Sequence, residues 1–114
     1  MTEFKQRKLK FRAWDKNERL LIRLNNLTCH KAELSKPEHI FLQFTGLHDK
    51  HGEEVYEMDI LLFDSEKRLV FWNEQSHGWS IAYAMDMTAS EPLKADTLKK
   101  GIRLCSYFEQ ATAS

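Results

Sequence analysis

Three carboxylates lie close together in the middle of this sequence. Asp49, Glu57 and Asp59 are separated by only a few residues, and carboxylates at such spacing can form an acid–base pair or hold a divalent cation. The alternative is a structural role, because carboxylates in tight turns accept backbone N–H hydrogen bonds and fix the loop. The turn residues around them favour the structural role, so we predict no catalytic residue in this stretch.

Histidines beside these acids raise the question of a metal site. His48 and His51 flank Asp49, and Cys29 and His30 could join them only through a fold that the sequence does not reveal. Zinc sites use four N or S ligands when closed and three when catalytic, and the chain has no C-x-x-C or H-E-x-x-H motif. We expect two solvated turn histidines, no metal site and no cofactor.

Motifs for nucleophilic or nucleotide chemistry are also missing from the sequence. There is no G-x-S-x-G elbow, no phosphate-binding G-x-x-x-x-G-K-[ST] loop and no G-x-G-x-x-G turn. Cys105 lies in an apolar segment, where we expect it to be a small core residue. Cys29 and Cys105 are expected to be reduced thiols, since the chain shows no secretion signal. The sequence therefore predicts that the protein is not an enzyme.

Residues 43–63 must position the carboxylates. Residues 49–52 have the composition of a turn, residues 55 and 56 are expected to enter the core, and residues 60–63 have the short apolar pattern of a buried strand. The glycines suit backbone with positive φ. The polar and glycine positions that define this turn are Gly46, Asp49, Gly52, Glu57 and Asp59.

The same stretch resembles a known family. Its pattern Q-F-T-G-L-x-D-x-x-G-x-x-V-Y-E-x-D-I, the K-F-R-A-W-D of residues 10–15 and the aromatic strands at 70–72 and 78–79 resemble the YopX family. Met58 stands where the family usually has glycine, and residues 105–110 replace a G-N-I-Y-E-N-like strand. The resemblance implies a small protein carried by bacteriophages or prophages, in a family without an assigned biochemical activity.

The remaining pattern indicates a mainly β fold with little helix. Alternation predicts an N-terminal β-hairpin over residues 8–24, and further strands over residues 40–44, 60–63, 68–72, 79–83 and 102–108. Residues 27–38 are expected to be a loop with one helical turn, and residues 85–98 to be irregular with a helical turn near residues 93–99. We predict one domain over residues 1–114, a small curled sheet or barrel. Residues 40–110 form its barrel-like core, and residues 57–83 an SH3-like meander.

Charge is unevenly distributed although the 114-residue chain is neutral. Basic residues outnumber acidic ones in residues 1–24, and acidic residues outnumber basic ones in residues 49–66. The two regions can contact each other or line a solvated surface. Alternatively, the basic arm can meet an acidic partner or the acidic region of a second copy. The candidate binding surface is Lys8, Lys10, Arg12, Trp14, Arg19 and Arg23.

Trp14 interrupts the alternation of the predicted hairpin. We expect it to cover the end of the hairpin or a corner of the core, and the alternative is a stacking surface for a ligand. With an exposed aromatic and basic strands, a small β-barrel can bind single-stranded nucleic acid. The neutral total charge and the acidic middle argue against that alternative.

These observations favour an accessory, non-enzymatic protein. Its expected partner is an unknown host or phage macromolecule or its own copies, with nucleic acid as the alternative and a small enzyme using Asp49, Glu57 and Asp59 as a third hypothesis. The 42% apolar and 30% charged composition is ordinary for a globular protein. No apolar run is long enough to cross a bilayer, so we expect a cytoplasmic protein without a membrane partner.

Overall fold

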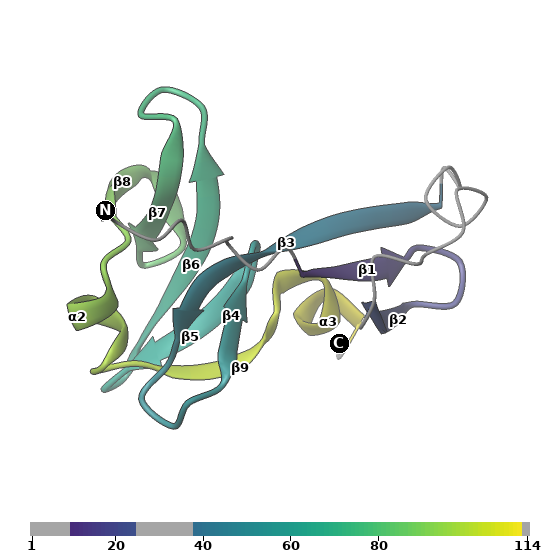
Figure 1. Cartoon of the computed structure of the whole chain (residues 1–114), viewed down its shortest axis with the longest axis horizontal. Coiled ribbons are helices and arrows are strands. Elements are labelled where there is room, and N and C mark those ends of the chain that lie inside the picture. Colours follow the sequence, from purple (N-terminus) through teal and green to yellow (C-terminus); the bar gives the residue numbers. More distant parts are fainter. Residues whose placement is uncertain (1–9, 25–37, 113–114) are drawn as a thin grey trace, which may run out of the picture.

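The computed structural model describes residues 10–24 and 38–112. Lys8, Cys29 and the expected helical turn within residues 27–37 lie outside the described residues. The elements are β1 Phe11–Asp15, β2 Leu20–Leu24, β3 His39–His48, β4 Glu54–Tyr56, β5 Asp59–Phe63, β6 Glu66–Asn73, β7 Gly78–Tyr83, β8 Asp86–Pro92, α2 Ala95–Leu98, β9 Ile102–Ser106 and α3 Tyr107–Thr112. They form two antiparallel sheets, with strand orders β2-β1-β3-β4 and β8-β7-β6-β5-β9 (Figure 1).

The predicted N-terminal hairpin is confirmed. β1 pairs with β2 from Phe11 opposite Leu24 to Asp15 opposite Leu20. Asp15 closes the turn, since its Oδ1 accepts hydrogen bonds from the backbone N–H groups of Asn17 at 2.9 Å and Glu18 at 3.0 Å. The hairpin is not isolated, because β1 also pairs with β3 along its whole length.

β3 is the long strand that connects the hairpin to the rest of the fold (Figure 1). Its first half pairs with β1, and its second half pairs with β4, where the register shifts between Phe44 and His48. Gly46 lies within this irregular segment with a φ of +87°. Such a φ is readily adopted by glycine and strained for residues with a Cβ, so Gly46 allows the strand to change partners.

The five-stranded sheet is a curled meander whose two faces are both largely covered. One face carries Leu61, Val70 and Ile81, which form a core cluster with Val55 of β4 and Leu98 of α2. The opposite face carries Ile60, Leu69, Phe71 and Ala82, with Met58, Met85 and Cys105 packed against them. Neighbouring residues of β6 therefore point to opposite faces and are both buried, which explains why that strand lacks a polar side. The predicted mainly β fold with a curled sheet and little helix is confirmed.

Three elements differ from the sequence prediction. Residues 54–56 form strand β4, where no strand was predicted. Residues 86–92 form strand β8 at the edge of the sheet, although an irregular segment was expected. This strand is mostly exposed, so the apolar alternation that marks a half-buried strand is absent from it. Phe108 belongs to helix α3 and not to the last strand, and its ring stacks on Trp14 with centroids 6.0 Å apart. The predicted helical turn before Gly101 is confirmed as α2.

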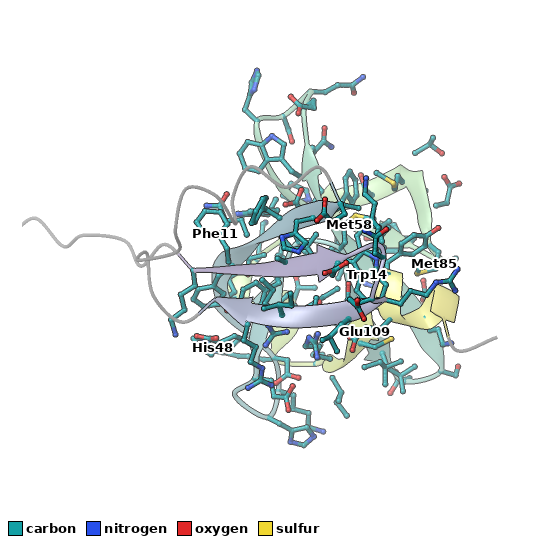
Figure 2. All side chains as sticks on the ribbon, turned by 90° about the vertical axis from the view of Figure 1, so that its right-hand side faces the viewer. Phe11, Trp14, His48, Met58, Met85 and Glu109 are labelled. Carbon is teal, nitrogen blue, oxygen red and sulfur yellow. The ribbon has the colours of Figure 1, made fainter. Side chains whose placement is uncertain are left out.

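The hairpin faces the viewer in Figure 2, with Trp14 labelled on it. Trp14 is only 6% exposed, which confirms that it covers a corner of the core. Because α3 supplies the stacking partner Phe108, the C-terminal helix connects the hairpin to β9. No helix in residues 10–24 and 38–112 is long and apolar enough to cross a membrane.

Met58 adopts a left-handed backbone conformation, with a φ of 65°. Its main chain is held on both sides, because its N–H donates to Val70 O at 2.7 Å and its carbonyl accepts from Tyr107 N at 2.7 Å. Its side chain packs against the cluster of Ile60, Leu69, Phe71 and Ala82. The position therefore combines backbone strain with useful side-chain packing, and glycine would remove both.

We predict that Met58→Ala destabilises the protein more than Met58→Gly, by about 1 kcal/mol, because alanine keeps the strain and loses the packing. The free energy of unfolding in urea measures this difference. Met87 in strand β8 is the matched control, since it lacks a positive φ and alanine should be the more stable substitution there. If the same substitution gave the more stable protein at both Met58 and Met87, the argument would be wrong.

Candidate functional site

The turn defined by Gly46, Asp49, Gly52, Glu57 and Asp59 folds as the sequence predicts. Gly52 has a φ of +81°, and Asp49 Oδ1 accepts hydrogen bonds from His51 N at 2.8 Å and Glu53 N at 2.9 Å. Its other oxygen, Oδ2, accepts from Arg103 N at 2.7 Å. Asp49 therefore closes its own turn and attaches that turn to β9.

Asp59 occupies the second corner of the motif. It is 1% exposed, and its Oδ2 accepts hydrogen bonds from Tyr56 N and from Arg103 Nε, both at 2.8 Å. Arg103 Nη2 reaches Oδ1 at 3.3 Å, so the guanidinium contacts both carboxylate oxygens. Burial raises the pKa of Asp59, and the hydrogen bonds and charge of Arg103 act against that shift.

Glu57 makes weaker contacts than the two aspartates. Its Oε1 lies 3.5 Å from Gln43 N, and burial raises the pKa of its carboxyl. Asp49 and Asp59 each use both oxygens as acceptors for protein N–H groups, which is the structural role that the turn composition favours. In residues 10–24 and 38–112, no group of three or more His, Cys, Asp or Glu side chains is placed to hold a metal ion.

Arg103 is the residue of this network that sequence reasoning missed. It lies 44 positions after Asp59 and 54 after Asp49, between two apolar residues that suggest an outward-pointing side chain. A register shift between β5 and β9 changes that alternation, so the Arg103 side chain is 11% exposed while Leu104 is 43% exposed. Burial lowers the pKa of Arg103, but the hydrogen bonds and charge of Asp59, with the charges of Glu109 and Glu53, raise it above its usual value, so the guanidinium stays charged.

The fold buries some residues of the candidate binding surface on the hairpin and leaves others exposed. Arg12 was expected to point outward, but it is 8% exposed, and its guanidinium lies 4.1 Å from the centroid of the Tyr56 ring. Tyr56 belongs to β4, two strands away from β1 in the same sheet, and the alternation within a single strand cannot reveal this contact. Arg19 and Arg23 remain exposed.

The basic and acidic regions of the sequence contact each other. Lys10 Nζ lies 2.6 Å from Glu54 Oε2, and the Arg12 guanidinium lies over the ring of Tyr56. Tyr56 joins the same contact, since its hydroxyl donates to Glu54 Oε1 at 3.1 Å. Of the alternatives that the sequence left open, internal pairing is therefore the one observed for these side chains.

An exposed aromatic groove lies elsewhere, on the five-stranded sheet. Trp72 on β6 is 39% exposed and Met87 on β8 is 49% exposed, and Trp79 packs edge-on against Trp72 with centroids 5.1 Å apart. The groove has a volume of about 500 Å³. It is lined by Phe71, Trp72, Asn73, Glu74, Gln75, Met87, Thr88 and Ser90. Sequence analysis missed it because β8, which supplies one wall, was not predicted as a strand.

The fold and the motif turn together define a class of small mainly β proteins built on a curled half-barrel with a hairpin sheet beside it. The YopX protein family matches residues 10–100, so the chain belongs to that family. A crystal structure of protein EF1440 from Enterococcus faecalis is similar in fold, with a TM-score of 0.67 and 15% sequence identity. The match covers 95% of this chain and 99% of that chain. A search of curated proteins gave no significant match.

We predict that Asp49→Asn destabilises the protein by about 1–3 kcal/mol at neutral pH, because the amide offers one acceptor where the carboxylate offers two. Burial raises the pKa of Asp49, but the N–H groups of Arg103, Glu53 and His51 lower it by more, so the net pKa lies below 3.8. The ionised carboxylate therefore stabilises the fold above pH 3.8, and this contribution is lost as the pH falls through the folded-state pKa.

Unfolding free energies of the wild type and Asp49→Asn should accordingly converge at acidic pH. Asp96→Asn is the control, since its carboxylate is 94% exposed and contacts only Lys99 among the described residues. A difference between wild type and Asp49→Asn that stays constant from neutral pH to below pH 3.8 would refute the pH argument.

We predict that Arg103→Met costs about 3–5 kcal/mol of unfolding free energy, because it leaves the buried Asp59 carboxylate without its cation. The double variant Arg103→Met/Asp59→Asn should lose less than the sum of the single variants, since the buried charge is then absent. Arg23→Met, at an exposed position of β2, is the matched control with an expected effect within about 0.5 kcal/mol. Strict additivity of the two single variants would contradict the coupling.

Proposed function

We propose that this chain is a non-enzymatic binding module that holds a segment of another protein in the groove beside Trp72 and Met87. The observation that carries the proposal is the exposure of these two large apolar side chains on opposite walls of one groove. Tryptophan and methionine are enriched in protein interfaces, and exposed apolar side chains gathered in a groove are typical of docking sites.

The composition of the groove supports a protein partner over a nucleic acid. Among the described residues, its lining includes one carboxylate, Glu74, and no lysine or arginine that could contact a phosphate backbone. β8 forms the outer edge of its sheet, and Thr88 and Ser90 of this strand line the groove. An extended partner segment can therefore pair with the backbone of β8 while an apolar side chain contacts Trp72.

The arrangement of the other candidate residues is in keeping with this proposal. Asp49 and Asp59 are occupied by backbone and arginine donors, which leaves them poorly placed for acid–base chemistry. Arg12 and Trp14 are buried, so the basic hairpin offers Arg19 and Arg23 without an adjacent exposed aromatic for base stacking. The phage and prophage habitat implied by the family resemblance makes a host or phage protein the proposed partner.

The test is capture of proteins by the tagged chain from bacterial lysate with and without nuclease treatment, followed by direct binding with the purified partner. We expect Trp72→Ala/Met87→Ser to weaken that binding by about tenfold or more. Leu20→Ser is the matched control, since Leu20 is 58% exposed on the other sheet, and it should bind as the wild type does. Thermal melting of each variant separates lost binding from lost folding.

The nucleic-acid alternative gives the opposite pattern in the same experiment. Capture would then disappear after nuclease treatment and with the charge-reversal variant Arg19→Glu/Arg23→Glu, and it would survive the change at Trp72 and Met87. That result would overturn the proposed function.

A further inference from the structure

A second groove lies where the end of α2 approaches the β5–β6 turn and strand β8. It has a volume of about 580 Å³ and is lined by Lys50, Phe63, Asp64, Arg68, Glu91, Thr97, Lys99 and Lys100. It shares no lining residue with the Trp72 groove. Its four cations come from three separate parts of the chain, so the fold is what gathers them.

Arg68 is the least exposed of these cations. Its guanidinium lies 4.7 Å from the ring centroids of both Phe63 and Tyr83. Two aromatic contacts restrict the side chain and reduce the entropy that it would lose on binding a ligand. Phe63 is itself held in place, because its ring packs against Gly101 so closely that a Cβ there would lie 2.6 Å from it.

The hydrogen-bonding capacity of Arg68 is largely unused by the described residues. Its Nε is buried without a hydrogen-bond partner among them, and its Nη2 lies 3.5 Å from Glu66 Oε2, a long contact to a carboxylate that is 40% exposed. An arginine offers five N–H donors in a planar fork that matches the oxygens of a phosphate or carboxylate. This guanidinium is thus positioned by rings and left available for an oxyanion.

The charge of the groove suits a phosphate group. Among the lining residues, Lys50, Lys99, Lys100 and Arg68 stand against two carboxylates, Asp64 and Glu91, which is an excess of two positive charges in the lining. Two carboxylates outside the lining also contact these cations, Glu66 at Arg68 and Asp96 at Lys99, each at 3.5 Å. Glu91 is already engaged, because it accepts a hydrogen bond from the Tyr83 hydroxyl. A phosphate monoester carries about −1.5 to −2 charges at neutral pH and therefore balances the excess.

The backbone around the lysines is fixed by hydrogen bonds. Lys50 N donates to Gly101 O at 2.9 Å, and Lys100 N donates to Thr97 O at 3.2 Å. The first of these bonds holds the turn after β3 beside the end of α2, so that Lys50, Lys99 and Lys100 line the same groove. The volume of the groove lies within the range of small-molecule sites. This volume is larger than a lone phosphate ion needs.

From this geometry we infer that the groove around Arg68 binds the phosphate group of a small molecule. The shared chemistry is the phosphate itself, which can be free in solution or carried by a nucleotide. This inference does not depend on the proposed protein-binding function, because the two grooves have separate lining residues.

The experiment is an NMR titration of the ¹⁵N-labelled full chain, with inorganic phosphate in one arm and adenosine monophosphate in the other. We expect shifts of the Lys50, Arg68, Thr97 and Lys100 amides that saturate and weaken with added salt. Equal affinity in both arms identifies free phosphate as sufficient, and tighter binding of the nucleotide identifies the attached group as part of the ligand.

Charge-removing variants test the cations without touching the core. Lys99→Gln/Lys100→Gln should weaken binding about tenfold, and Lys67→Gln/Lys94→Gln, which removes two exposed lysines that do not line the groove, should leave it unchanged. Arg68→Lys keeps the charge but loses the fork, so it should also weaken binding. Absence of saturable shifts in both arms, or equal weakening by both double-lysine variants, would overturn the inference.

Discussion

The contact between Arg103 and Asp59 is the interaction around which the motif turn is joined to the five-stranded sheet. Asp59 is almost fully buried and needs a cation, and Arg103 provides one from a strand 44 residues away. The backbone N–H of the same arginine binds Asp49, so one residue of β9 attaches both corners of the motif turn. The two aspartates of the motif therefore join the turn after β3 and the start of β5 to β9.

Several side chains of the basic hairpin and the residue before it make their contacts within the fold. Arg12 stacks on Tyr56, Lys10 pairs with Glu54, and Trp14 stacks on Phe108 of α3. These contacts bring together segments from the start, middle and end of the chain, and they neutralise part of the uneven charge seen along the sequence. Part of the charge asymmetry along the sequence is therefore compensated by contacts within the fold.

The two grooves differ in chemistry and suit different ligands. The groove beside Trp72 is aromatic and carries one carboxylate, whereas the groove around Arg68 has four cations and only two carboxylates. Both border β8, the edge strand with mostly exposed residues. Membership of the YopX family and the similarity to EF1440 establish the fold, while a protein partner and a phosphate ligand are proposals that rest on these surfaces.

The sequence by itself determined the family, the mainly β class, the hairpin, the motif turn and the buried strands, because turn composition and apolar alternation are local properties. Only the tertiary structure decided the partners of Asp59, the burial of Arg12 and the existence of β8. Arg103 is separated from Asp59 by 44 residues, and β8 is held by pairing with β7 and not by its own apolar pattern. Both grooves are likewise assembled from distant segments, so no local pattern could place their side chains together.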